Sequence, residues 1–413
     1  MTAMVDEDLD FHGRPLAQHV PRELVRRIDF FNGPGMDRDP FTLARAMRDE
    51  LPMLYNLQNP LKGQSWLPTR AEHIRTILAD PVTFSSAEQA GFAELIGESW
   101  RLGPVEMDPP DHGKFRRLMN PWLSPPAVSR LSDHVRQRAV DLIDAFLDSG
   151  RCEFVSQFGT PFPISIFMEL MGLPQSLTQT FLVWVDQLLH SDDFATKRAG
   201  AISIGNYLRT LIADRQRQPV DDLASRIVAA HVDDAPISED DMMGLAYLLF
   251  TGGLDTVASS VAFHIHHLAT HPDLQERLRH HPEDIPKAVE ELLRAFSPVV
   301  SQRRVTNDIE IAGVQMRRGD WITLIHSIAS LDPSEFDEPD RVDIDRRNNR
   351  HFGFAYGPHF CAGAHLARRE LQIALEEWTS RVPPFRLAEG SDVESHGGIV
   401  FGVRKLELSW APL

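Results

Sequence analysis

The chain has 413 residues, 42% of them hydrophobic, which is enough apolar material for a sizeable core. Its formal charge of −17 argues against nucleic acid and anionic membranes as partners, although a local basic patch remains compatible with it. The two cysteines, Cys152 and Cys361, lie too far apart in sequence to suggest a disulfide framework and fit a reducing cytoplasm.

The first forty residues are rich in Pro and Gly and predict an extended arm, followed by one domain over 41–413. The acidic N-terminus lacks the apolar core of a signal peptide, and no apolar run approaches the roughly 18 residues that a membrane span needs. We therefore expect a soluble, cytoplasmic protein. Short elements follow the arm: helices at 41–49 and 71–78, a strand pair at 53–66 between them, and an irregular segment at 84–103.

A series of helices is predicted for the middle of the chain. Asp108 is the expected N-cap of the first, with two prolines in its first turn. The segment Ser124-Pro-Pro126 opens a longer helix that ends at Gly150. Further helices are predicted at 164–171, 177–189, 197–217 and 285–296, and strands at 304–312, 314–316, 321–324, 399–403 and 406–410.

The longest helical pattern runs over 240–269 and has an unusual centre. Gly252 and Gly253 each cost about 1 kcal/mol relative to alanine inside a helix, and Asp255 and Thr256 then follow in an apolar stretch. One interpretation is a kinked core helix in which Thr256 bonds back to a carbonyl. A functional interpretation explains more, because glycines admit a flat cofactor to the backbone and a local opening lets an acid and an alcohol relay protons.

Four histidines follow on the same helix, at positions 264, 266, 267 and 271. His267 and His271 have the i, i+4 spacing of metal ligands, but no Glu of the H-E-x-x-H kind lies between them. We interpret the histidines as a solvated helix end.

Cys361 lies in the segment HFGFAYGPHFCAGAHLARRE, where a loop becomes a helix. We expect the helix to begin at or next to Cys361, since unpaired N–H groups and the helix dipole favour a thiolate. Gly357 can take the positive φ of a tight turn, and Gly363 would let a flat ligand lie against the backbone. Phe354 adds apolar cover. A lone cysteine is more often buried and inert, but the flanking pattern outweighs that alternative here.

The run Phe354-x-x-Gly357-x-His359-x-Cys361-x-Gly363 resembles the haem-ligand loop of the cytochromes P-450, whose proximal ligand is a cysteine thiolate. Ala355 stands where the family usually has Gly, a departure of one methyl group. The run Gly253-Leu-Asp-Thr256 resembles the oxygen-activating helix of that family. Glu291 and Arg294, which alone would predict a surface pair, resemble its Glu-x-x-Arg pair, with Arg341 as the third member of a buried ion network.

The resemblance covers nearly all the chain past residue 40 and is closest to the soluble bacterial camphor-hydroxylase class. It implies a mostly helical, triangular fold around a buried haem b, with a small β-rich lobe from about 53–66, 304–324 and 399–410. Cys361 would be the axial ligand, with Gly252 and Gly253 close to the cofactor. Arg116, Arg303 and His359 stand at positions that hold haem propionates in this class.

The resemblance also implies a monooxygenase that hydroxylates a small apolar substrate, terpenoid or norisoprenoid-like, with dioxygen. Asp255 and Thr256 would deliver protons. Electrons would come from a two-iron ferredoxin with its NAD(P)H-dependent reductase, docking on Arg116, Arg368 and Arg369. Expected substrate contacts, beneath a lid over 177–217, are Trp100, Leu248, Thr251, Val299, Ile399 and Val400.

Camphor itself is not the expected substrate, because Trp100 stands where camphor hydroxylases carry a hydrogen-bonding tyrosine. The alternatives are a peroxide-driven haem-thiolate enzyme, which would not need the acid–alcohol pair, and a haem-based sensor or carrier. We expect a monomer.

Overall fold

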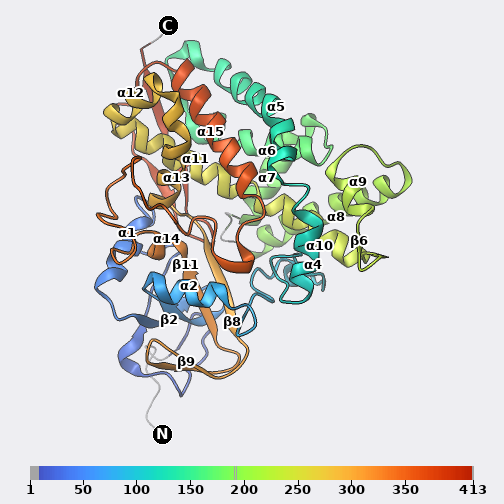
Figure 1. Ribbon diagram of the computed structural model, residues 1–413, viewed down its shortest axis with the longest axis vertical. Helices are drawn as coiled ribbons and strands as arrows, with labels where there is room; N and C mark the ends of the chain where they lie inside the picture. The colour runs from blue at the N-terminus through green and yellow to red at the C-terminus, as the bar shows by residue number, and fades with distance from the viewer. Residues whose placement is uncertain (1–8, 190, 192, 412–413) are drawn as a thin grey trace. The chain divides into compact units, whose positions relative to one another are not determined.

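The computed structural model describes residues 9–189, 191 and 193–411 (Figure 1). Residue contacts divide the chain into two compact units, each discontinuous in sequence. The first, called the sheet unit here, takes the chain up to Gln89 together with Lys287–Cys361 and Val393–Arg404. The second, the helix unit, takes Ala90–Pro286, Ala362–Asp392 and the chain from Lys405 onward. The single domain expected over 41–413 stays a prediction.

The sheet unit is built on a six-stranded mixed sheet. Its strands, in spatial order, are β1 (Val25–Arg26), β2 (Met53–Asn59), β3 (Gly63–Pro68), β11 (Trp321–Ile325), β8 (Val300–Val305) and β4 (Phe84–Ser85). The predicted strand pair over 53–66 is confirmed as β2 and β3, which pair antiparallel. Nearly every residue of β2 is buried, including the polar Asn56 and Asn59, whose side-chain amides donate hydrogen bonds to the Ile28 carbonyl and to Thr323 Oγ1.

Residues 304–312 were expected to form one strand and instead form parts of two. β8 ends at Val305, and β9 (Ile309–Ile311) pairs with β10 (Val314–Met316) in a separate hairpin. The Asp308 carboxylate between them accepts a 2.6 Å hydrogen bond from the Arg317 guanidinium. This contact holds the hairpin in its own register, so the chain leaves the main sheet after Val305.

Short helices and loops complete the sheet unit. They are η2 (Arg22–Leu24), α1 (Phe41–Ala46), η3 (Met47–Asp49), α2 (Ala71–Ala79), α14 (His326–Ser330) and η8 (Gly357–His359), with α13 (Ile285–Ala295) at its boundary and the strand pair β13 (Glu394–His396) and β14 (Gly402–Lys405). Phe41 anchors α1 in the core, with its ring 5.5 Å from that of Phe296 and 6.0 Å from that of Phe401. The predicted helices at 41–49, 71–78 and 285–296 are confirmed.

The helix unit holds most of the helices. They are α3 (Phe92–Ile96), α4 (Asp111–Met119), α5 (Pro125–Asp144), α6 (Pro161–Leu170), α7 (Thr178–Leu189), α8 (Phe194–Arg217), α9 (Leu223–Val228), α10 (Glu239–Gly252), α11 (Asp255–Thr270), α12 (Pro272–His280) and α15 (Ala364–Arg381). Short turns are η4 (Leu147–Ser149), η5 (Val155–Gly159), η6 (Gln175–Leu177) and η7 (Pro282–Asp284), and the strands are β5 (Arg151–Glu153), β12 (Phe385–Leu387), β15 (Glu407–Trp410) and the hairpin β6 (His231–Val232) and β7 (Ala235–Pro236). α15 lies along α5, as Figure 1 shows.

The predicted N-cap of α4 is wrong. Pro110, and not Asp108, occupies that position, and the Asp108 backbone carbonyl accepts a hydrogen bond from the His112 N–H over 3.0 Å. Pro109 and Pro110 have no backbone N–H, and the helix begins at Asp111.

Two apolar clusters stand out in the part of the helix unit that the structure describes. One surrounds Tyr247 and Phe250 on α10 and takes in side chains from α3, α4, α6, α7, α8 and α9. The other surrounds the buried indole of Trp378 on α15, with the rings of Phe154 and Phe158 at 4.9 and 5.5 Å. The stretch 239–270 is long and apolar enough to cross a membrane, but 56% of its most apolar window is buried inside the protein, as in a core helix.

Candidate active site

The predicted proton-relay pair follows a break in the long central helical stretch. α10 ends at Gly252 and α11 begins at Asp255, so the continuous helix expected over 240–269 is two helices joined by a turn. The Thr256 Oγ1 hydroxyl donates a hydrogen bond to the Gly252 carbonyl over 3.0 Å. The kinked helix with a back-bonded threonine is therefore present. It leaves Thr256 able to act on protons, because the hydroxyl oxygen keeps its lone pairs.

The two glycines at this break leave the backbone open. Both are exposed, although the stretch around them is largely buried. A Cβ at Gly252 would approach nothing closer than Leu248 Cδ1 at 3.7 Å, and one at Gly253 nothing closer than the Leu249 carbonyl oxygen at 3.8 Å. A flat ligand can therefore approach this backbone without a side chain in the way.

Cys361 lies in a closed loop of the sheet unit. Its N–H donates to the Phe354 carbonyl over 2.9 Å, and the Phe360 N–H donates to the Gly357 carbonyl over 3.0 Å. The Cys361 side chain is exposed and forms no disulfide. α15 begins at Ala364, with Gly363 as its N-cap, so the helix starts three residues later than expected.

The turn before Cys361 depends on one glycine and strains one alanine. Gly357 has φ = 72°, and a Cβ there would lie 2.6 Å from the Leu78 carbonyl oxygen, so no other residue fits. Ala355 also has a positive φ, 61°. An L-residue pays about 1–2 kcal/mol for this conformation, which explains why the related loops usually have glycine at that position.

Two of the predicted propionate partners belong to the sheet unit: Arg303 lies on β8, and His359 lies two residues before Cys361. Arg303 is 3% exposed, and its Nη1 donates to Gln89 Oε1 at 3.2 Å and to the Gln302 carbonyl at 2.7 Å. Burial, and then the charge of Arg303, lower the pKa of His326 to about 4, so this neighbouring imidazole is neutral. His359 lies in η8, with its Nε2 3.2 Å from Ser86 Oγ.

The remaining predicted arginines belong to the helix unit. Arg116 is in the last turn of α4. Arg368 and Arg369 are half-buried on α15, and Arg369 Nε donates to Ser132 Oγ on α5 over 3.1 Å. Arg369 also pairs with Glu376 at 3.5 Å, so part of its charge is already compensated.

The predicted buried ion network exists, but its third member is wrong. Glu291 and Arg294 have fully buried side chains joined by a 2.8 Å ion pair. Arg346, and not Arg341, completes it, with Nε 3.2 and 3.1 Å from the two Glu291 oxygens. Arg341 contributes only its backbone carbonyl, to Arg294 Nη2 at 3.0 Å. The Arg341 guanidinium instead makes an exposed pair with Glu338. A turn in which the Arg346 N–H donates to the Asp343 carbonyl directs Arg346, and not Arg341, toward Glu291.

Comparison with known proteins decides the family. The model of the family Cytochrome P450 matches residues 163–284 and 285–381. "Probable cytochrome P450 127A1" of Sinorhizobium fredii (strain NBRC 101917 / NGR234) is 40% identical over 404 residues, covering 96% of this chain and 97% of that protein. The chain belongs to the cytochrome P450 family. "Mycinamicin IV hydroxylase/epoxidase" of Micromonospora griseorubida is 31% identical over 364 residues, 85% of this chain and 91% of that protein.

Solved structures agree. The crystal structure of cytochrome P450 CYP101C1 matches with a TM-score of 0.87 and 31% identity, covering 96% of this chain and 99% of that one. CYP101J2 matches with a TM-score of 0.86 and 30% identity, at the same coverage. The predicted fold class, mostly helical with a smaller β-rich part, is therefore confirmed. The cytochrome P450 is a monooxygenase, and its cofactor is haem b with a cysteine thiolate as the axial ligand.

The side chains of this cytochrome P450 fit a haem. Cys361 offers an exposed thiol in a constrained loop. The open backbone at Gly252 and Gly253 suits a flat macrocycle. Arg303 and His359 supply donors of the kind that bind carboxylate groups such as the propionates.

The predicted substrate contacts fall into two sets. Trp100 is buried, its ring lies 4.8 Å from that of Tyr247, and its indole N–H donates to the Glu98 carboxylate. The Thr251 hydroxyl donates to the Tyr247 carbonyl over 2.9 Å, and Leu248 packs on the edge of the same apolar cluster. The second set, Val299, Ile399 and Val400, is half-buried in the sheet unit and joined through the backbone: Val299 forms an isolated β-bridge with Val400, and the Val300 N–H donates to the Ile399 carbonyl.

Sequence reasoning missed Glu98, which links Trp100 to Arg209 on α8 within the helix unit. Its carboxylate accepts the Trp100 N–H and also pairs with the Arg209 guanidinium of α8. Glu98 thus fastens the segment after α3 to one helix of the predicted lid, of which residues 190 and 192 lie outside the described part of the chain. An acid in an irregular segment carries no periodic signal, so only the folded arrangement reveals this contact.

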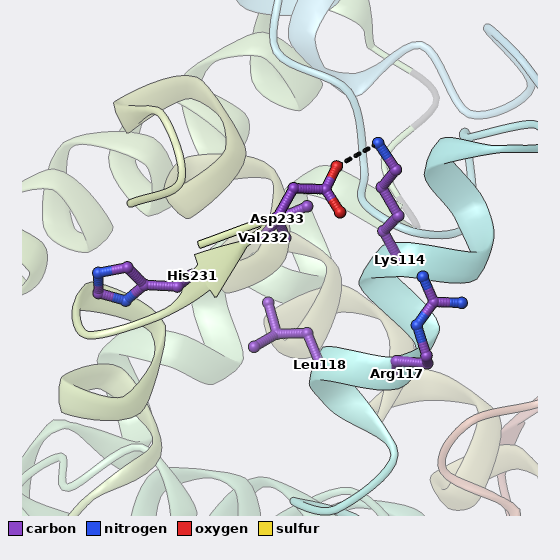
Figure 2. A pocket seen from close by; sticks show the side chains of 6 residues that line it. All are labelled: Lys114, Arg117, Leu118, His231, Val232 and Asp233. Atoms are coloured by element: carbon purple, nitrogen blue, oxygen red, sulfur yellow. Dashed lines mark ion pairs between the residues drawn. The ribbon is translucent and has the colours of Figure 1, made fainter. Parts of the chain in front are cut away.

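A further hollow of about 240 Å³ opens on the helix unit between α4 and the β6–β7 hairpin (Figure 2). Its lining is Lys114, Arg117, Leu118, His231, Val232 and Asp233. Lys114 Nζ pairs with Asp233 Oδ2 at 2.5 Å, and this hydrogen bond raises the pKa of the lysine. Figure 2 shows Lys114 and Arg117 extending to the same side of α4, so the hollow has a partly compensated basic wall.

Proposed function

We propose that this cytochrome P450 hydroxylates a small, apolar, terpenoid-sized substrate with Cys361 as the axial ligand. The assignment of Cys361 as the ligand rests on the difference in solvent exposure between the two cysteines. Cys152 is buried in β5, and desolvation raises the pKa of its thiol far above the usual range. Cys361 is exposed in a loop fixed by Gly357. A thiolate ligand needs the second environment.

The haem, when bound, supplies reductive dioxygen activation, in which one oxygen atom enters a substrate C–H bond and the other leaves as water with two electrons and two protons. The chain supplies the path for those protons. With its hydrogen directed at the Gly252 carbonyl, Thr256 Oγ1 presents its lone pairs on the other side and accepts a hydrogen bond there. Asp255, in the first turn of α11, is the carboxylate that exchanges protons with solvent.

Arg116, Arg303 and His359 are the proposed partners of the propionates. The buried position of Arg303 supports this role, since a guanidinium with 3% exposure is stabilised by an anionic partner. Its Nη1 already binds two neutral oxygen acceptors, which orients the guanidinium plane. The other nitrogens of the fork then point in fixed directions.

An apolar substrate is supported because two polar groups among the predicted substrate contacts are already hydrogen-bonded within the protein. The Trp100 N–H is used by Glu98, and the Thr251 hydroxyl is used by the Tyr247 carbonyl. A small ketone such as camphor would therefore gain no hydrogen bond from Trp100, which weakens its binding by about 0.5–1.5 kcal/mol relative to a site with a donor. A terpenoid ether or norisoprenoid that binds mainly through apolar contacts is the better candidate.

The proposed electron donor is a small acidic two-iron ferredoxin with an NAD(P)H-dependent reductase, and the proposed location is the cytoplasm. Arg116, Arg368 and Arg369 form the basic part of the docking surface despite the net charge of −17. Such a surface raises the association rate in a salt-dependent way. Charge reversal at Arg368 should slow reduction at low salt and flatten its salt dependence, and an unchanged rate would discard this docking surface.

The ligand assignment is tested by Cys361→Ser with Cys152→Ser as the matched control. We expect Cys361→Ser to lose the red-shifted ferrous–CO Soret band of a thiolate ligand together with oxygenation, while Cys152→Ser keeps both. A Cys361→Ser variant that keeps the band would place the ligand elsewhere. Thr256→Ala should divert reductant to hydrogen peroxide, whereas Thr256→Ser, which retains the hydroxyl, should stay coupled.

The substrate class is tested by titrating the enzyme with camphor, cineole and an ionone and reading the spin shift of the haem. Tighter binding of cineole or the ionone, with coupled hydroxylation, supports the proposal. If camphor binds tightest and is hydroxylated with full coupling, the argument from Trp100 is wrong.

A further inference from the structure

The segment 90–106 of the helix unit carries Trp100, a predicted substrate contact, and α3 is its helical part. Glycines with a positive φ stand at both ends of α3, Gly91 at 70° and Gly97 at 79°. A Cβ at Gly97 would meet nothing within 4 Å, so neighbouring atoms do not hold the turn at this position. The segment therefore needs a restraint other than packing at its glycines.

The side chain of Glu106 supplies this restraint. It is 6% exposed, and each of its oxygens accepts from a different end of the segment. Oε1 accepts from the N–H groups of Ala90 and Gly91 over 2.8 and 3.3 Å, and Oε2 accepts from the Leu102 N–H over 3.0 Å. The Glu106 N–H donates in turn to the Leu102 carbonyl over 2.8 Å. One carboxylate thus closes residues 90–102 into a loop.

This closure needs two acceptor oxygens on one side chain. A carboxylate accepts at both oxygens, whereas the amide of glutamine accepts at one and presents N–H groups at the other. In Glu106→Gln, one end of the loop would therefore meet a donor with a donor. A buried backbone N–H that loses its acceptor destabilises the conformation that buries it, so that end of the loop comes free.

The closed loop lies directly on α10. A Cβ at Gly244 would overlap the Arg101 carbonyl oxygen, so the backbones of α10 and of the loop touch there. Trp100 packs on Tyr247, with the ring centroids 4.8 Å apart. Tyr247 lies five residues before Gly252, where the backbone is open to a flat ligand, a distance of about 7.5 Å along the helix. A change in the loop therefore changes the surroundings of that opening.

We propose that Glu106 is a positioning residue that determines the shape of ligand the enzyme admits. By closing the loop that carries Trp100, it fixes the room beside α10 for a molecule bound at the haem. The inference rests on the proposed contact of Trp100 with the substrate, and it concerns the size of the ligand and not its chemical class. Glu106 itself touches neither substrate nor cofactor and acts through Trp100.

The test compares two nitrogen ligands of different size, imidazole and N-benzylimidazole, on the ferric holoenzyme. Stopped-flow mixing gives an association rate constant for each from the Soret shift that accompanies nitrogen ligation, without substrate or electron donor. In Glu106→Gln, the rate constant of N-benzylimidazole relative to that of imidazole should rise about threefold or more, because entry of the larger ligand no longer waits for the closed loop. The rate constant of imidazole should stay as in the parent protein.

Glu153→Gln is the matched control. The Glu153 carboxylate, in β5, also uses both oxygens on three backbone N–H groups, those of Val155, Ser156 and Leu406. This variant should lose stability in urea and keep the parent ratio of rate constants.

Two further variants complete the series. Glu106→Asp keeps both acceptor oxygens on a side chain one carbon shorter, so its ratio should lie between those of the parent and Glu106→Gln, and it serves as the test if the glutamine variant does not fold. Trp100→Ala checks the contact on which the proposal rests and should raise the ratio as well.

The outcomes separate the role of Glu106 from the contact of Trp100. If Trp100→Ala raises the ratio and the Glu106 variants keep the parent value, the contact stands and the role of Glu106 is wrong. If none of these variants changes the ratio, Trp100 does not border the ligand and both are wrong. An equal change for both ligands in Glu106→Gln, or the same rise in Glu153→Gln, would show general loosening of the fold and would also overturn the proposal.

Discussion

Replacing Arg346 by alanine should destabilise the protein strongly, whereas the same change at Arg341 should not. The Arg346 side chain is 10% exposed, and its Nε binds both oxygens of the fully buried Glu291 carboxylate. Removing one partner of a buried ion pair costs about 3–5 kcal/mol, because the other charge remains in a poor environment. Arg294 stays in place to compensate Glu291, so we expect the lower end, about 3 kcal/mol.

Arg341 provides the matched control. Its guanidinium is 64% exposed and pairs with Glu338, which is 73% exposed, at 3.2 Å. Exposed pairs of this kind contribute about 0–1 kcal/mol. Its backbone carbonyl, which does bind Arg294, survives the change to alanine. The loss in Arg341→Ala should therefore stay below about 0.5 kcal/mol.

The assay is urea unfolding of the holoprotein, followed by far-ultraviolet circular dichroism and by the haem Soret band. An unchanged slope with a lower midpoint would show that stability, and not the compactness of the unfolded state, has changed. Arg346→Lys should fall between the two alanine variants, because it keeps the charge and loses the guanidinium fork. Equal losses in Arg341→Ala and Arg346→Ala would refute the assignment of Arg346 to the network.

Three further outcomes are expected. Ala355→Gly should raise the free energy of unfolding by about 0.5–1 kcal/mol in urea titrations, because glycine adopts φ = 61° without steric strain; a loss would contradict this. Burial lowers the pKa of His264 to about 3. Below pH 6.5 this imidazole therefore binds a proton in the unfolded chain and stays neutral in the folded protein. Stability should fall by about 2 kcal/mol from pH 7 to pH 5 on this account, and His264→Leu should lack that part of the slope. Asp233→Asn frees Lys114 and should speed reduction by the ferredoxin severalfold at low salt, while Asp234→Asn, on the same turn, should not; equal rates would show that Lys114 takes no part in docking.

The sequence was most informative where chemistry and backbone conformation depend on the same residues. The loop around Cys361 could be predicted because Gly357 both makes its turn and cannot be replaced. A continuous helix with a local opening at Gly252 and Gly253 was predicted over 240–269, and the break between α10 and α11 falls at these glycines, whose cost in a helix needs a reason. In both places the local preference and the tertiary role agree.

Prediction failed where several similar residues compete for one position. Arg341 and Arg346 lie in the same irregular segment, and only the turn that joins the Arg346 N–H to the Asp343 carbonyl selects between them. Trp100 was identified as a large ring near the pocket, but its N–H partner, Glu98, is set by the path of a loop. A hydrogen-bond partner in irregular structure has no periodicity to reveal it.

The turn at Gly253–Leu254 separates α10 from α11, and these two helices pack against largely different elements. α10 packs mainly against α8 and α9, whereas α11 packs mainly against α12, α15, η5 and β12, and α6 contacts both. Most neighbours of α8 and α10 therefore differ from those of α11, where Asp255 and Thr256 lie. The break would therefore let substitutions on α8 and α10 alter one set of helix contacts while most contacts of α11 stay as they are.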